Sequence, residues 1–442
     1  MKPMSVWHSL MVWIDRWHWV WLAAAAPFLL FPTPARAPVL LVIPALWVIA
    51  RIAGNESLPA TPLNGALLLL SATILTSLLV TFDLAFSLNK ISGVLLGVSV
   101  FFTTVRWLDD TGSLKLGLSG FLLGGVTFAL FGFLGTQWSL KIETFQVIIN
   151  RLPPIIRGLP GAADGFHPNA VAGILLLFLP LQTILLLETT VCQTLSKKSE
   201  MEWLCTGPGI AMQIVLLTLT FGVFLLTQSR GAWLSFGVIM LALLSWHSSL
   251  TRRWFVIVIL GAALLMFVMG PQRVFALVFN DSGSIELGWA ARVELWSRAI
   301  YGIEDFPLTG MGIGNFRYAM PIMYPAFLTS PDFDVAHAHN HLLQAALDLG
   351  VLGLVAYLSL WLGAAVMLLW VYRFSHNNLY RTAAVGLGTG LMAHFIFSMT
   401  DAIPLGTKAG VIFWATLGLA TGMFKITRRK VMESNASLTP TT

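Results

Sequence analysis

The sequence predicts an all-helical integral membrane protein, a bundle of about twelve transmembrane helices with one large outer loop between the ninth and tenth spans. Hydrophobic residues make up 57% of the 442 residues and charged residues 10%, and the mean hydropathy is +0.80. A soluble core could not bury that much apolar surface, whereas a lipid-embedded bundle can. The basic residues are spread between apolar runs instead of forming one patch, which argues against a nucleic-acid partner.

Apolar segments of roughly bilayer-crossing length recur along the chain. They lie at about residues 17–34, 38–52, 62–81, 86–105, 117–135, 169–189, 208–227, 231–248, 253–270, 347–372, 382–400 and 408–425. The chain therefore divides into nine spans in 1–270, an extracytoplasmic loop at 271–346, three spans in 347–430 and a polar tail at 431–442 that we expect to be disordered in the cytoplasm.

Positive charge follows alternate loops, at Arg51, Arg106, Lys197 and Lys198, Arg252 and Arg253, and near both ends. By the positive-inside rule these loops and both termini are cytoplasmic, and the loops at 136–168 and 271–346 face outward. The apolar run near the N-terminus is interpreted as an uncleaved first span. Cys192 and Cys205 flank a loop predicted to be cytoplasmic, so we do not expect a structural disulfide.

The long loop is too polar to be a span, and loops of this length tend to carry function. Within it, residues 288–304 are predicted to form an amphipathic helix, because Val293, Trp296, Ala299 and Ile303 recur at helical spacing. The helix should end before Pro307, since the residue preceding a proline is disfavoured in helical conformation. The glycines at 310, 312 and 314 lack the flanking strand and Lys-Ser/Thr of a nucleotide loop and are interpreted as a turn.

Arginines are unexpectedly common on the predicted outer side. They are Arg151, Arg157, Arg230, Arg273, Arg292, Arg298 and Arg317. Arginine binds phosphate through a planar fork and keeps its charge, so these positions indicate an anionic, phosphate-bearing ligand. The alternative is that several of them pair with nearby acidic residues or lipid headgroups. Arg230 fits that alternative least, because it lies in a short turn with no acidic neighbour in sequence.

Histidines cluster just before the tenth predicted span, at His337, His339 and His341. If this segment is helical, His337 and His341 share a face and could bind a metal, although no nearby acidic residue completes a familiar ligand set. A polar cap at the membrane interface is a second alternative. The preferred interpretation is a general base, because neutral imidazole can accept a proton from a hydroxyl near pH 7.

Several of these residues resemble the signature of the O-antigen ligase and polymerase superfamily. His339 and Asn340 are followed, after nine residues, by a Gly350-to-Gly353 motif at the end of a long outer loop. Other segments similar to that family's recurring elements are 165–169, 229–231, 292–296 and 305–314. The resemblance covers about residues 160 to 400.

The resemblance implies a metal-independent, inverting glycosyltransferase of the bacterial inner membrane, without a cofactor. Such enzymes take a glycan from undecaprenyl diphosphate and transfer it to a hydroxyl of lipid A-core, of a growing glycan or of a protein. The resemblance makes His339 the catalytic base and Arg230 and Arg292 the two essential arginines. Candidate substrate-binding residues are Asn340, Arg298, Arg317, Arg157, His337, Tyr318 and Trp296, with Asp334 as a residue that could orient an imidazole. Tyr318 and Trp296 could equally anchor the loop at the interface.

A membrane transporter is the alternative from another class, since about twelve spans with both termini inside is a common carrier architecture. Carriers usually place ionisable residues in mid-membrane, whereas here the charges crowd one surface. That distribution favours surface chemistry. Within the enzyme class, ligase is preferred to polymerase and to protein glycosylation because of the His-Asn motif, although nothing in the sequence identifies the acceptor.

Overall fold

The computed structural model describes residues 6–30, 34–56, 58–152, 155–159, 162–194, 202, 204–279, 288–329 and 334–438. Over this part of the chain the fold is all-helical, and the only bridges between extended residues are isolated ones, Thr136 with Phe166 and Leu159 with Ala162. The predicted all-helical class is confirmed. The loop containing Lys197 and Lys198 lies outside the described residues.

The N-terminal half contains short apolar helices followed by longer ones. The elements are α1 (Val6–Arg16), α2 (His18–Leu30), η1 (Pro34–Leu41), α3 (Val42–Ile52), α4 (Asn64–Ser77), α5 (Leu84–Trp107), α6 (Thr111–Gly135), η2 (Glu143–Phe145), α7 (Gln146–Ile149), α8 (Pro168–Leu175), α9 (Leu179–Thr194) and α10 (Gly207–Leu226). Asp83 caps α5 and Asp110 caps α6 through side-chain oxygens that accept main-chain N–H groups, which satisfies donors that a helix start leaves unpaired.

The C-terminal half contains α11 (Arg230–His247), α12 (Ser249–Met269), α13 (Pro271–Phe279), α14 (Trp289–Asp305), α15 (Phe316–Met323), α16 (His341–Phe374), α17 (Asn378–Ser398), η4 (Lys408–Gly410) and α18 (Val411–Leu438). The helix expected at 288–304 is confirmed as α14, and the tight turn before Arg230 separates α10 from α11 as expected. The tail expected to be disordered from 431 is instead helical as far as Leu438, and residues 439–442 lie outside the described part.

Membrane-spanning capacity is clearest for seven helical segments that are long and apolar enough to cross a bilayer. They are 84–107, 111–135, 168–194, 207–226, 249–269, 341–374 and 408–436. Four shorter apolar helices, at 18–30, 38–52, 64–77 and 230–245, also match predicted spans. The protein therefore has several membrane-length helices, and the count of about twelve stays a prediction.

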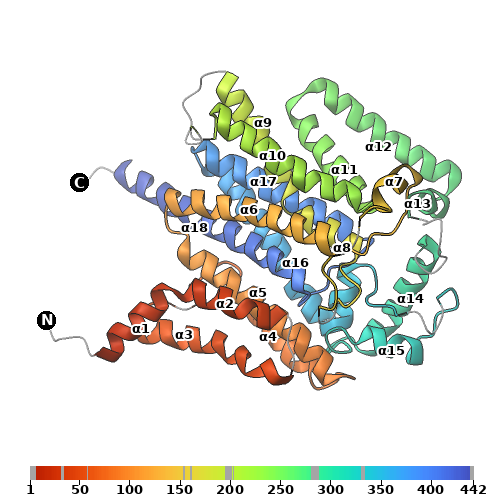
Figure 1. The fold of residues 1–442 in the computed structure, drawn as a ribbon, viewed down its shortest axis with the longest axis horizontal. Helices are drawn as coiled ribbons and strands as arrows, with labels where there is room; N and C mark the ends of the chain where they lie inside the picture. Colours follow the sequence, from red (N-terminus) through yellow and green to blue (C-terminus); the bar gives the residue numbers. More distant parts are fainter. Residues whose placement is uncertain are drawn as a thin grey trace.

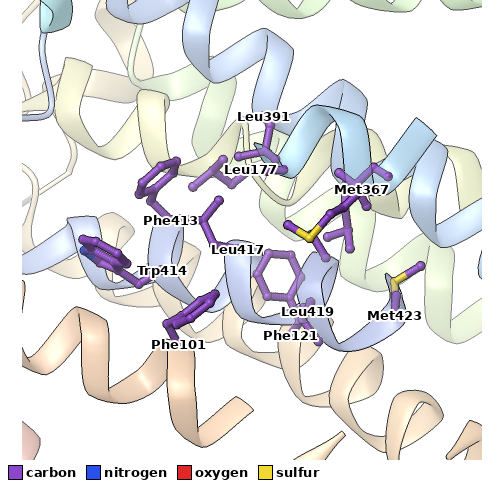
Figure 2. Packing of buried hydrophobic residues seen from close by; sticks show 14 of the residues in the cluster. Phe101, Phe121, Leu177, Met367, Leu391, Phe413, Trp414, Leu417, Leu419 and Met423 are labelled. Atoms are coloured by element: carbon purple, nitrogen blue, oxygen red, sulfur yellow. The ribbon is translucent and has the colours of Figure 1, made fainter. Parts of the chain in front are cut away.

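Helices α5, α6, α16, α17 and α18 meet in the main hydrophobic core (Figure 2). Phe101 of α5, Phe121 of α6, Met367 of α16 and Trp414 of α18 are all buried there. The Trp414 ring packs so closely on α5 that a Cβ at Gly97 would lie 2.0 Å from it. This packing fixes the ends of α16, α17 and α18 that lead into the loops described next.

Both termini lie at one end of the bundle, and α13, α14 and α15 gather at the other (Figure 1). The start of α16 and the connection after α17 are joined to each other, because the Asn340 side chain donates a hydrogen bond to the Met399 carbonyl over 3.1 Å. Gly350 interrupts α16 with φ of 71°, a conformation that only glycine adopts easily. The kink places the turn after α14 against α16, where the Val351 N–H donates to the Pro307 carbonyl over 2.7 Å.

Candidate active site

The backbone at His339 is held by the cap of the following helix. The side-chain oxygen of Asn340, Oδ1, accepts hydrogen bonds from the N–H groups of Leu342 and Leu343, at 2.9 and 3.1 Å. The side-chain amide of Asn340 donates to the Met399 carbonyl. Asn340 was expected to bind substrate. In the structure its side chain caps α16 and bonds to Met399, which positions His339, and its expected contact with substrate stays a prediction.

Two non-glycine residues have positive φ among the described residues, Gln228 at 50° and His339 at 49°. This conformation costs roughly 1–2 kcal/mol for a residue with a Cβ, and such strain concentrates at functional sites. Gln228 immediately precedes the turn to Arg230. Its side chain accepts from the N–H groups of Lys141 and Ile142, at 2.9 and 2.7 Å, and thereby fastens the loop after α6 to this turn.

Asp401, in the connection after α17, is the carboxylate that contacts His339. Its Oδ1 lies 3.2 Å from His339 Nδ1, and Asn169 donates to its Oδ2 over 2.8 Å. Burial alone would raise the pKa of Asp401, but the charges and hydrogen bond of His339, together with His337 and Arg292, hold it well below 3.8. An ionised carboxylate can only accept hydrogen bonds. His339 Nδ1 therefore donates to Asp401, which leaves Nε2 as the nitrogen that can act as a base.

Arg230 and Arg292 line one cavity together with Asp401. Arg230 is the first residue of α11, and Arg292 lies in the first turn of α14 and is 7% exposed. Helix N-termini carry partial positive charge that attracts anions. Two guanidinium groups at two helix starts therefore create a site suited to an anionic group, and the structure brings the two predicted arginines to the carboxylate that contacts the predicted base.

Three further polar residues, Lys141, His167 and Asn169, belong to this site and had no role assigned from the sequence. Lys141 donates to Asn169 over 3.1 Å, and both line the cavity. The pKa of His167 is lowered, mainly by burial. Asp401 opposes this shift, whereas the nearby basic groups Lys141, His339 and Arg292 reinforce it. His167 therefore lies within the same electrostatic environment. The segment 165–169 had attracted notice as a motif. No local signal marked Lys141 or Asp401.

His337 lies beside His339, with ring centroids 4.4 Å apart. Its Nε2 is 3.8 Å from Asp401 Oδ1, and its Nδ1 accepts the main-chain N–H of His339 over 3.2 Å. Burial, and then His339, lower the pKa of His337 to about 3. His337 is therefore a neutral group that supports the His339 backbone.

Ligand atoms of His337, His339 and Asp401 lie within 4.8 Å of one another, a spacing that could hold a metal ion. The hydrogen bonds favour another arrangement. Since His337 Nδ1 accepts an N–H, its proton lies on Nε2, the atom nearest Asp401, whereas a metal ligand needs a lone pair there. In this arrangement His339 Nδ1 at 3.2 Å and His337 Nε2 at 3.8 Å both face the Asp401 carboxylate through N–H groups.

His341 does not share a face with His337, because residues 337–340 are not helical and α16 begins at His341. Its ring is buried, with Nδ1 3.0 Å from the Tyr357 hydroxyl and the Phe395 ring 4.7 Å away. The possible metal pair of His337 and His341 is therefore wrong. His341 is a packed residue of the first turn of α16.

Asp334 was expected to orient an imidazole, and this was wrong: Asp334 forms an ion pair with Arg317 instead. The Arg317 guanidinium also lies 5.3 Å from the centre of the Phe86 ring. Arg298 pairs with Glu294 at 3.4 Å, and Glu294 also accepts the Phe327 N–H over 2.7 Å. Arg298 and Arg317 thus stabilise the segment between α14 and α16 through acidic partners, which is the alternative left open for several of the arginines.

Tyr318, Trp296 and Arg157 complete the predicted set. Tyr318 is 40% exposed, Trp296 packs edge-on against Trp289 with centroids 5.3 Å apart, and Arg157 is exposed. Among the described residues, none of the three makes a hydrogen bond or ring contact with His339. Their expected contacts with substrate remain predictions.

The fold is that of a helical membrane protein, and its site has two arginines and Asp401 at one cavity, with His339 in contact with Asp401. Residues 214–358 match the family model described as O-antigen ligase, which confirms the resemblance drawn from the motifs. The matched segment contains Arg230, Arg292 and His339, while Lys141, Asn169 and Asp401 lie outside it. No curated protein matches the chain.

Proposed function

We propose that the protein is an inverting, metal-independent glycosyltransferase of the O-antigen ligase type, acting on the outer side of the bacterial inner membrane. The donor would be a glycan on undecaprenyl diphosphate and the acceptor a hydroxyl of lipid A-core. The family match indicates glycosyltransferase activity of the ligase or polymerase type. The observation that carries the finer proposal is His339, which Asp401 holds with a free Nε2 lone pair next to a cavity containing Arg230 and Arg292.

The chemistry follows from these groups. His339 Nε2 takes the proton of the acceptor hydroxyl, and that oxygen attacks the anomeric carbon from the face opposite the diphosphate. The bond between the anomeric carbon and the diphosphate oxygen breaks, and the electron pair leaves with undecaprenyl diphosphate. Arg230 and Arg292 stabilise the charge that grows on this leaving group, while Asp401 stabilises the imidazolium.

The same geometry would serve a polymerase or a protein glycosyltransferase, because these reactions share the donor and the base and differ in the acceptor. The acceptor therefore has to be identified by assay. The donor half of the mechanism is common to all three, and it depends on the same His339, Arg230 and Arg292.

The test is glycan transfer by the full chain in detergent, from an undecaprenyl diphosphate-linked glycan and with EDTA present. Lipid A-core and a free glycan chain are offered as acceptors. We expect His339→Asn and Arg230→Ala to abolish transfer, and Arg253→Ala, an exposed arginine at the start of α12, to retain it. Whichever acceptor is modified separates ligase from polymerase.

An active His339→Asn variant would refute the base assignment. Loss of wild-type transfer on adding EDTA, restored by a divalent metal, would refute metal independence. If no acceptor were modified, the glycosyltransferase proposal would fail, and the transporter alternative would be tested by measuring transport into vesicles.

A further inference from the structure

A second cavity, of about 330 Å³, lies between α5, α18 and the segment just before α4. Ala60, Thr61 and Pro62 of that segment and Val105 of α5 line it, together with seven residues of α18 between Thr421 and Glu433. From Val411, at 1.5 Å per residue, these positions lie roughly 15 to 33 Å along α18, comparable to the thickness of a bilayer core of about 30 Å. The cavity is therefore near the opposite membrane face from the candidate active site.

The course of α5 supports this placement. The start of α5 is joined to the start of α15, because the N–H of the cap residue Asp83 donates to the Asn315 side chain over 2.9 Å. Val105 lies at the other end of the same helix. Figure 1 shows the C-terminal end of α18 at the end of the bundle that holds both termini, away from α14 and α15.

The rim of the cavity is cationic. Lys425, Arg428 and Arg429 line it, and Glu433 is the only acidic residue among its lining residues. Lys425 and Arg429 share Asp109, at 3.8 and 3.0 Å. Each is 46% exposed, so both remain within reach of a ligand at the rim. Arg428 is exposed as well.

The wall of the cavity is largely apolar. Val105 of α5 and Phe424 and Met432 of α18 supply this surface. An apolar wall beneath a cationic rim suits a ligand that carries both a charged headgroup and acyl chains.

We propose that this cavity binds an anionic phospholipid, with the phosphate at Lys425 and Arg428 and an acyl chain along Val105 and Phe424. Basic pockets between membrane helices bind such headgroups through both charge and apolar contact. The proposal is independent of the glycosyltransferase function. The bound lipid would join α5 to α18, the two helices that pack on each other through Gly97 and Trp414.

The test is native mass spectrometry of the full chain in detergent, titrated with phosphatidylglycerol or with phosphatidylcholine of the same acyl chains. We expect the first phosphatidylglycerol to bind more tightly than phosphatidylcholine. Each basic residue near a lipid surface contributes about 1 kcal/mol, or roughly fivefold in affinity. Replacing both Lys425 and Arg428 by Gln should therefore weaken phosphatidylglycerol binding roughly 25-fold and largely remove the preference.

A matched control sharpens the result. Arg253→Gln, at an exposed arginine outside the cavity, should bind lipid as the wild type does. The melting temperature of each variant without added lipid controls for folding. Equal binding of the two lipids by the wild type, or unchanged phosphatidylglycerol binding by the folded double variant, would overturn the proposal.

Discussion

Replacing Asp401 by Asn tests the central contact of the site, because it keeps the shape of the side chain and removes its charge. At 3.2 Å and an effective dielectric constant of about 20, a unit charge on Asp401 would stabilise the His339 imidazolium by about 5 kcal/mol. Since 1.36 kcal/mol corresponds to a factor of ten in rate, this sets an upper limit of roughly 10⁴ on the loss in kcat. We expect Asp401→Asn to lower kcat by 10² to 10⁴-fold, in the range seen for the carboxylate of a Ser-His-Asp triad.

The assay is single-turnover glycan transfer with saturating donor, so that chemistry is separated from product release. Asp334→Asn is the matched control: Asp334 is 66% exposed and pairs with Arg317, and an exposed pair of this kind is worth about 0–1 kcal/mol. Its kcat should fall less than about fivefold, the equivalent of 1 kcal/mol. Combining Asp401→Asn with His339→Asn should cost little more than His339→Asn alone. Two results would show that Asp401 does not act through His339. One is a wild-type rate for Asp401→Asn, and the other is a double variant whose loss in kcat equals the product of the two single losses.

Other substitutions test the surrounding structure. Arg292→Lys keeps the charge but loses the planar fork, so kcat/KM should fall more than about tenfold, measured by donor titration; a value within twofold would argue against bidentate phosphate contact. Gly350→Ala should lower the free energy of unfolding by at least about 1–3 kcal/mol, because φ is 71° and the new Cβ would meet Leu308 at 2.5 Å; an unchanged Tm would contradict this. The folded pKa of His337, about 3, lies below its ordinary value of 6.5, so the unfolded chain binds the proton first and stability is lost as pH falls from 6.5 towards 3. His337→Gln should therefore show a smaller fall in Tm over this window, and an equal fall would place the acid sensitivity elsewhere.

Much of the fold could be predicted because apolar runs of bilayer length have few other uses. Every predicted span overlaps a helix, and α14 lies within one residue of its expected bounds. Hydropathy, however, gives no information on local backbone geometry. Gly350 divides α16 by adopting a positive φ, yet the sequence marked it only as part of a motif and gave no sign of the kink.

The site was only partly visible in the sequence for a related reason. Arg230 and His339 stand out because each breaks a local expectation, a charge in a short outer turn or a histidine in a cluster. Asp401 is 62 residues from His339 and follows a span as an ordinary loop acid, so only the packing of α17 against α16 brings it into contact. Asp334 was the nearer acid in sequence, but the residues between it and His339 are not helical, and its side chain turns to Arg317.

The left-handed backbone at His339 also limits which amino acids can occupy that position. At φ of 49°, glycine, asparagine and aspartate are tolerated, whereas β-branched residues are strongly disfavoured. In a saturation library sorted first for membrane expression and then for transfer, position 339 should yield a well-expressed but inactive class made of these small or locally hydrogen-bonding residues. Valine and isoleucine should be depleted at the first sort, before any demand for catalysis is applied.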